Sequence, residues 1–437
     1  MMEVKPVDSR AGLEGRFLDA FEVNRTHLSN GHGEAMAETR DRAIHVFEEL
    51  GFPGTKDEAW KYTPIRRVLE NEYLLSIAPD LPSSSSIDHS PYRIEGLAAH
   101  VAVFVNGVFA PDLSRIDGDV LSVIPLLDAV DHPSFRRLFA RRTDELKEVF
   151  STLNTAFARN GLFVHARPGK PDALHVINLT QGTSDIFVQP RHLIVADDEA
   201  TLTVVETHVG EGGVQHFTNA VAECFVGARA RLDYYRVQDD PGMSGVTTSL
   251  LHQKDSSYAS CTTITLSGGT IRNNVNVLPE AQFCESHLVG LFLGRGDMHV
   301  DNHTMVDHAV PDCFSNELYK GILADRSKGV FNGKVLVRPD AQRTNAYQSN
   351  KSIILDESAS MNAKPELEIY ADDVKCSHGA TTGRLDAEAL FYLRSRGLSE
   401  QRARTMLLLA FARDVLENVA SQPVRDWLDA RVEEYLA

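Results

Sequence analysis

The feature that most constrains the fold of this chain is a long succession of short strand-forming segments between residues 172 and 374. Turn residues such as Gly227, Gly268 and Asp325 separate these segments at intervals of roughly thirty residues. Strands at a near-constant spacing, without a repeated sequence, are typical of the stacked coils of a β-solenoid. A single β-sandwich of this size would need an unusually large number of strands, although the pattern also fits two sandwiches. The segments include residues 202–205, 232–235, 334–337 and 367–370.

Helical patterns flank this strand-rich region on both sides. Apolar residues recur at helical spacing around residues 17–21 and 43–50, and Gly51 and Pro53 then end the second of these helices. The second helix is expected to begin near Asp41. Residues 81–86, a Leu-Pro pair followed by four serines, have the composition of a linker. Beyond Asp386 a broad apolar helical face returns, and it must be buried against the β body or against a partner protein.

These patterns divide the chain into three regions. Residues 1–95 are predicted to be an N-terminal helical region, residues 96–383 a β-helix core, and residues 384–437 a C-terminal helical domain. Alternating valines before Asn106 and Gly107 predict a β-hairpin at the start of the core. Apolar residues on one helical face predict a helical insertion near residues 143–159. The predicted fold class is therefore mainly β, a β-helix (solenoid) core flanked by helical regions.

Composition narrows the range of partners. The formal net charge is −17, so the surface repels phosphates, and nucleic acid is not an expected partner. No apolar run is long enough to span a bilayer, and the first residues lack the apolar segment of a signal peptide, so a cytoplasmic location without membrane contact is expected. The five cysteines include no Cys-x-x-Cys pair, which argues against a self-contained zinc or cluster site and favours reduced, buried thiols.

One strand that leads into a glycine-containing turn carries Cys376 and His378. Residues two apart on a strand point to the same side, so the thiolate and the imidazole could share a soft metal such as iron or zinc. Two ligands are too few for a stable site, and a partner would have to supply the others. The residues alone favour a structural turn with a buried thiol and a hydrogen-bonded histidine.

A second polar cluster lies between residues 301 and 308. Asp301, His303 and Asp307 fall on one side of a predicted strand and His308 on the other, which suits metal binding or acid–base chemistry. Without a further ligand or catalytic group elsewhere in the sequence, the residues favour the other interpretation, a polar face of the solenoid. The chain contains no Gly-x-Ser-x-Gly nucleophile motif and no Gly-x-x-x-x-Gly-Lys-Ser/Thr phosphate loop, so ATP hydrolysis by that route is excluded.

Several segments of the chain match a known family. They are the surroundings of Cys376 and His378, and residues 58–63, 153–157, 331–335 and 391–397. Together these segments, which cover both ends of the chain and the β body, resemble the SufB/SufD family of iron–sulfur cluster assembly proteins. Three positions resemble its SufD branch: Gly379 replaces a glutamate of SufB-like chains, Leu393 replaces a cysteine, and residues 348–350 contain no cysteine.

This resemblance implies a non-catalytic scaffold with two partners. SufD-like chains pair with SufB through the ends of their β-helices and bind SufC, an ABC-type ATPase, through C-terminal helices. His378, as a metal ligand, and secondarily Cys376 would handle iron or a cluster at the SufB interface. The chain would hold no cofactor firmly by itself, only transient iron or an iron–sulfur cluster within the complex. The residues expected to bind SufC are Phe391, Tyr392, Leu393, Met406, Leu409 and Phe411.

Two other functions are compatible with the residues. A solenoid enzyme acting on polysaccharide would use Asp301, His303 and Asp307 on a strand face. A homodimeric interaction module would have no metal role, and because SufD-like chains can self-associate when SufB is absent, a homodimer of the isolated chain would not separate the hypotheses. Capture of an ABC-type ATPase would separate the scaffold from the enzyme.

Overall fold

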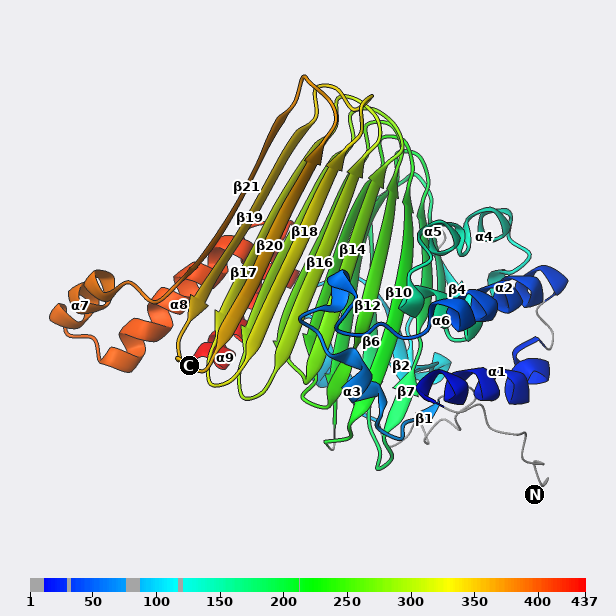
Figure 1. Ribbon diagram of the computed structural model, residues 1–437, viewed down its shortest axis with the longest axis horizontal. Helices are drawn as coiled ribbons and strands as arrows, with labels where there is room; N and C mark the ends of the chain where they lie inside the picture. Colours follow the sequence, from blue (N-terminus) through cyan, green and yellow to red (C-terminus); the bar gives the residue numbers. More distant parts are fainter. Residues whose placement is uncertain (1–11, 30–32, 76–86, 117–120, 212) are drawn as a thin grey trace.

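The computed structural model describes residues 12–29, 33–75, 87–116, 121–211 and 213–437, and within them two parallel sheets form a β-solenoid (Figure 1). Strands alternate between the sheets along the chain, so each coil of the solenoid adds one strand to each sheet. The predicted mainly β solenoid with helical regions at both ends is confirmed. The linker expected at residues 81–86 lies outside the described residues.

The path of sheet A runs β20-β18-β16-β14-β12-β10-β8-β5-β4, so from β8 onward this sheet contains the even-numbered strands. Two short strands, β1 (Leu74–Leu75) and β7 (Ile186–Val188), pair beside this path. The bounds on the path are β4 (Leu121–Pro125), β5 (Gly161–Ala166), β8 (Arg191–Ala196), β10 (His216–Val226), β12 (Met243–Gln253), β14 (Thr270–Pro279), β16 (His299–His308), β18 (Lys328–Val337) and β20 (Ser360–Ile369).

Sheet B runs β21-β19-β17-β15-β13-β11-β9-β6-β2-β3. The predicted hairpin is confirmed: β2 and β3 pair antiparallel around Asn106 and Gly107, whose φ angles of 51° and 80° suit a tight turn. The bounds are β2 (His100–Val105), β3 (Val108–Phe109), β6 (Asp172–Thr180), β9 (Thr201–Gly210), β11 (Arg231–Asp239), β13 (Tyr258–Ser267), β15 (Glu285–Gly294), β17 (Phe314–Leu323), β19 (Asn345–Ile354) and β21 (Lys375–Gly383).

The interior of the solenoid is the main hydrophobic core. Leu174, Val204, Leu232, Leu251 and Val275 from successive coils pack together there, each 2% exposed or less. Neighbouring strands of a parallel sheet lie about 4.8 Å apart, so residues paired in register stack directly upon one another. Any side chain that points inward on one coil therefore touches the inward side chains of the coils before and after it.

The N-terminal helices cover the outer face of sheet A (Figure 1). Helices α1 (Leu13–Ser29), α2 (Glu34–Leu50) and α3 (Ile65–Leu69) belong to this region. Helix α2 ends before Gly51, as predicted, but it begins well ahead of Asp41. Aromatic rings join the helices to the sheet. The Phe17 ring of α1 contacts the Phe187 ring of β7, with 5.1 Å between centroids, and the Phe187 ring stacks on Phe217 of β10.

The helical insertion consists of three short helices, α4 (Pro133–Leu138), α5 (Arg141–Leu146) and α6 (Val149–Ala156), and so begins earlier than predicted. A buried ion pair fixes it to sheet A. Arg191 Nη2 lies 2.6 Å from Glu223 Oε2, and the Glu223 carboxylate also accepts hydrogen bonds from the backbone N–H groups of Ala140 and Arg142. A fully buried carboxylate with several donors is stable because its lost hydration is replaced.

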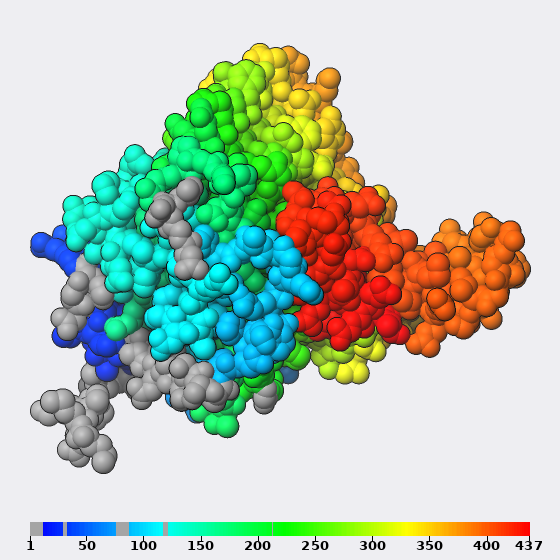
Figure 2. Space-filling model, turned by 180° about the vertical axis from the view of Figure 1, so that it is seen from behind, coloured from blue at the N-terminus to red at the C-terminus, as the bar shows by residue number. Residues whose placement is uncertain are grey.

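The C-terminal region contains α7 (Ala387–Ser395), α8 (Glu400–Leu416) and α9 (Gln422–Leu436). Helices α8 and α9 pack on the outer face of sheet B, where Leu408, Val415 and Leu428 join a cluster with Val237 and Ile264. Seen from behind, α9 also lies beside the segment around residue 95, whereas α7 projects away from the body (Figure 2). No helix among the described residues is long and apolar enough to cross a membrane.

Candidate functional site

The two ends of the solenoid differ. At the N-terminal end, both sheets finish with short antiparallel strands, β3 in sheet B and β4 in sheet A. At the other end, the last strands are β20 and β21, and within the described part of the chain each of them pairs with a strand on one side only. The residues of β20 are mostly half-buried and those of β21 mostly exposed. We call this end, formed by β20 and β21, the open end.

Cys376 and His378 lie on β21 at the open end. They pair in register with Ala346 and Gln348 of β19, both buried and inward-pointing, so the thiol and the imidazole continue the interior face of sheet B. Cys376 is half-buried, and this burial raises the pKa of its thiol, whereas His378 is exposed. Among the described residues, no group of three or more His, Cys, Asp or Glu side chains is arranged to hold a metal ion.

A buried polar ladder, which the sequence analysis did not identify, continues inward from His378. Gln348 is its register partner, and Glu317 of β17 is in turn the partner of Gln348. The Gln348 Nε2 amide donates to Glu317 Oε2 at 3.3 Å, and the Thr304 hydroxyl donates to the same oxygen at 2.5 Å. Burial raises the pKa of the Glu317 carboxyl to about 7. Counting back from His378 by one coil and then another would have found both residues.

The second polar cluster anchors the N-terminal region. Asp301 Oδ2 accepts hydrogen bonds from the Thr63 hydroxyl at 2.5 Å and from Arg272 Nη1 at 3.1 Å, and His303 Nε2 lies 3.0 Å from Asp301 Oδ1. The Arg272 guanidinium also stacks on the Trp60 ring at 3.8 Å. Burial alone would raise the pKa of Asp301, but the charges of His303 and Arg272 outweigh it and hold that pKa well below its usual range.

The remaining members of that cluster lie elsewhere. Asp307 forms a two-pronged ion pair with Arg338, with contacts of 2.9 and 2.7 Å. His308 is fully buried and lies 2.9 Å from the Ser315 hydroxyl. The structure therefore brings Asp301 and His303 together under the N-terminal segment and keeps Asp307 and His308 apart from them.

The C-terminal residues expected to bind a partner fall into two groups. Phe391, Tyr392 and Met406 are 74%, 56% and 45% exposed. Leu409 is buried in the cluster against sheet B, and Phe411 is packed beneath the Lys320 ammonium, 4.3 Å from its ring centroid. Leu393, on α7, is half-buried. Within the C-terminal region, the exposed large apolar side chains therefore lie on α7 and α8.

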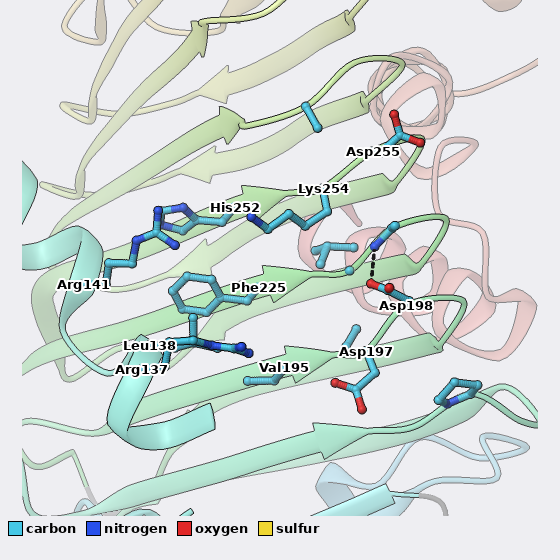
Figure 3. Close-up of a pocket in the computed structure, with 16 residues that line it drawn as sticks. Arg137, Leu138, Arg141, Val195, Asp197, Asp198, Phe225, His252, Lys254 and Asp255 are labelled. Atoms are coloured by element: carbon cyan, nitrogen blue, oxygen red, sulfur yellow. Dashed lines mark hydrogen bonds between the residues drawn. The ribbon is translucent and has the colours of Figure 1, made fainter. Parts of the chain in front are cut away.

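A cavity of about 770 Å³ lies between the helical insertion and the outer face of sheet A (Figure 3). Arg137 and Arg141 reach in from the helices, while Phe225 and His252 line the sheet side. Glu280 contacts three nearby basic side chains: Arg141 at 2.7 Å, and Lys254 and His252 each at 3.1 Å. The hydrogen bond from His252 is the largest of the contacts that lower the pKa of Glu280 to about 2.

Two family models match the chain. The SUF system FeS cluster assembly, SufBD core domain, matches residues 178–411, and the SufBD protein N-terminal region matches residues 11–170. An iron-sulfur cluster assembly SufBD family protein of Synechocystis is 31% identical over 415 residues, which are 90% of this chain and 89% of that protein. The iron-sulfur cluster assembly protein SufD of Escherichia coli is 29% identical over 422 residues, 94% of this chain and 95% of its own.

The fold and these matches define a β-solenoid protein of the SufBD type, because its core and its N-terminal region each match a SufBD family model. The chain belongs to the SufB/SufD family of the SUF iron–sulfur cluster assembly system. The iron-sulfur cluster assembly protein SufD of Bacillus subtilis is a further relative, 27% identical over 304 residues and covering 67% of each chain.

Proposed function

We propose that this chain is the SufD-type scaffold subunit of a Suf complex and that its open end joins the solenoid of a SufB-type partner. The observation that carries the proposal is the pair of strand edges left unpaired on β20 and β21. Each edge offers a row of backbone N–H and C=O groups, and a second solenoid can satisfy both rows by continuing the two sheets. A joint of this kind buries the interior face that carries Cys376 and His378.

The choice of the SufD branch rests on residues at the same end. Gly379 and the cysteine-free segment at 348–350 lie on β21 and β19, where SufB-like chains are expected to carry a glutamate and a cysteine. Two relatives that are named SufD and match two thirds or more of this chain support the same branch. A partner that does carry those residues would bring the missing acidic and thiol ligands to the joint.

In this proposal, iron or a nascent cluster is cargo that two chains hold between them. His378 offers an exposed imidazole, and Cys376 a thiol that keeps its proton until a metal displaces it, because burial raises its pKa. One chain then supplies two ligands and the partner completes the set. The role proposed for this chain is positioning and not catalysis.

Helices α7 and α8 supply the second interface. Aromatic and methionine side chains left exposed on a projecting helix are typical anchors for a partner protein. We assign Phe391, Tyr392 and Met406 to the binding of a SufC-type ATPase. Motion of that ATPase during its cycle would pull on α8, whose other face is packed against β15 and β17, and would open the joint to iron and sulfide.

The test is a single substitution in the reconstituted complex. We expect His378→Ala to lower the iron and acid-labile sulfide that co-purify with the complex while leaving its size unchanged. His45→Ala is the matched control, because His45 is an exposed histidine of α2 with a 70% exposed side chain, far from the open end. Undiminished iron and sulfide in an intact His378→Ala complex would contradict the proposed role of this residue.

A further inference from the structure

Two cysteines occupy the same position in consecutive coils of the solenoid. Glu285 begins β15 and pairs with Phe314, which begins β17, so the residues immediately before them, Cys284 and Cys313, are register neighbours. The backbone ladder continues through this point, because the Phe314 N–H donates to the Cys284 carbonyl at 2.9 Å. The two cysteines are thus held side by side at the turns that lead into sheet B.

The two sulfur atoms also converge. Cys284 Sγ lies 3.1 Å from the Ala281 carbonyl oxygen, and Cys313 Sγ lies 3.4 Å from the same oxygen. Adjacent parallel strands are about 4.8 Å apart. Disulfides span Cα separations of about 4.4–6.8 Å. A bond between these sulfurs therefore requires side-chain rotation and leaves the stacking of the coils in place.

The pair is chemically asymmetric. The hydrogen bond from the Cys313 thiol lowers the pKa of Cys284, and the same contact together with burial raises the pKa of Cys313. Cys284 is therefore the sulfur expected to ionise first, and it is the candidate nucleophile of the pair. The other buried thiols differ: burial raises the pKa of both Cys224 and Cys261, which makes them inert.

The pair lies close to solvent although both thiols are buried. Phe283, immediately before Cys284, is 57% exposed and has a φ angle of 60°, and Asp312, immediately before Cys313, has the same φ angle. Residues with this left-handed backbone mark tight surface turns. Opening a single turn, which is a local and low-energy event, would admit a small oxidant.

We propose that Cys284 and Cys313 form a reversible dithiol–disulfide site that is oxidised by hydrogen peroxide or another hydroperoxide. The Cys284 thiolate attacks the peroxide, the O–O bond breaks, and a sulfenic acid and hydroxide form. The Cys313 sulfur then attacks the sulfenic sulfur, the S–O bond breaks, and its own proton leaves with the departing hydroxide as water. In total, two thiols and one hydrogen peroxide give one disulfide and two waters, whereas an organic hydroperoxide would give one alcohol and one water, and a dithiol reductant reverses the change.

The experiment uses the full purified chain without partners, so its result is independent of the function proposed for the open end. The folded chain is treated with hydrogen peroxide, free thiols are blocked, and the digest is examined by mass spectrometry. We expect a cross-linked pair of peptides carrying Cys284 and Cys313, a loss of two of the five free thiols, and recovery of both after dithiothreitol. Cys376→Ser is the matched control and should form the same cross-link.

A second measurement tests which of the two cysteines is the nucleophile, and it uses chemical labelling of the sulfenic acid. In Cys313→Ser, peroxide should leave Cys284 as a sulfenic acid that reacts with dimedone, whereas in Cys284→Ser the remaining Cys313 should stay unlabelled. Wild-type chain in which both cysteines remain free thiols after peroxide, or in which each is oxidised without joining the other, would overturn the proposal. Predominant labelling of Cys313 in Cys284→Ser would overturn the assigned roles.

Discussion

Glu317 allows a quantitative test of the polar ladder inside the solenoid. Its carboxyl is fully buried, Thr304 and Gln348 donate to one of its oxygens, and its other oxygen has no hydrogen-bond partner among the described residues. Burial raises its pKa from 4.5 to about 7. Because the folded state then holds this proton more tightly than the unfolded state, the carboxyl contributes full stability below pH 4.5, and that stability is lost as the pH rises through 7.

The size of the effect follows from the shift in pKa. One pKa unit corresponds to about 1.4 kcal/mol, so ionisation of Glu317 costs roughly 3 kcal/mol of folding free energy above neutral pH. Glu317→Gln keeps the shape and an acceptor oxygen but carries no charge, and the unpartnered Gln348 Oε1 is available to its new amide. We therefore expect the variant to match the wild type at about pH 5 and to exceed its stability by about 2–3 kcal/mol at about pH 8.

The assay is urea unfolding of both chains at the two pH values, followed by circular dichroism. Glu206→Gln is the contrasting control. Burial would raise the pKa of Glu206, but Arg236 and His208 outweigh it and hold that pKa well below its usual value, so this substitution should cost about 3–5 kcal/mol at neutral pH. The reasoning about Glu317 would be refuted by a difference between Glu317→Gln and wild type that is the same at both pH values.

Two further predictions concern the outer surfaces. Replacing Phe391 and Tyr392 together by serine should weaken capture of a SufC-type ATPase at least about tenfold. The free energy of unfolding should change by less than about 0.5 kcal/mol, since neither side chain is buried. The buried Leu409 should behave differently, and Leu409→Ala should cost about 2–5 kcal/mol of stability in thermal or urea unfolding. Asp301→Ala should cost about 3 kcal/mol and speed proteolysis of the N-terminal segment, because Arg272 loses its buried counter-charge; unchanged proteolysis would contradict the anchoring role.

Local signals in the sequence predicted much of the architecture. The hairpin at Asn106 and Gly107 could be predicted because a tight turn needs residues that tolerate positive φ, and the end of α2 at Gly51 follows from the same property. The prediction that α2 begins near Asp41 is wrong. An acidic residue in the middle of a helix cannot be distinguished by its type alone from one near the N-terminal cap. The helices at 133–138 and 141–146 were missed because each is too short to show a periodic face.

The sequence predicted only part of the candidate site. Cys376 and His378 are two residues apart on one strand, so their shared face follows from strand geometry alone. Gln348 and Glu317 belong to other coils, so placing them beneath His378 requires a count of the residues in each coil, because local propensity does not encode the register of stacking. The use of Asp301 as an anchor also could not be foreseen, because Thr63 and Arg272 reach it only through tertiary folding.

The unequal ends of the solenoid have a consequence for how such chains assemble. A head-to-tail contact between identical chains leaves a fresh edge each time and grows into a filament, whereas a contact between two like ends closes after one step. Here the N-terminal end finishes in the short strands β3 and β4, two and five residues long, which give an incoming sheet little to extend. Among the described strands, β20 and β21 alone offer long free edges at an end of the solenoid, so we expect assembly through the sheets to stop at two solenoids joined open end to open end.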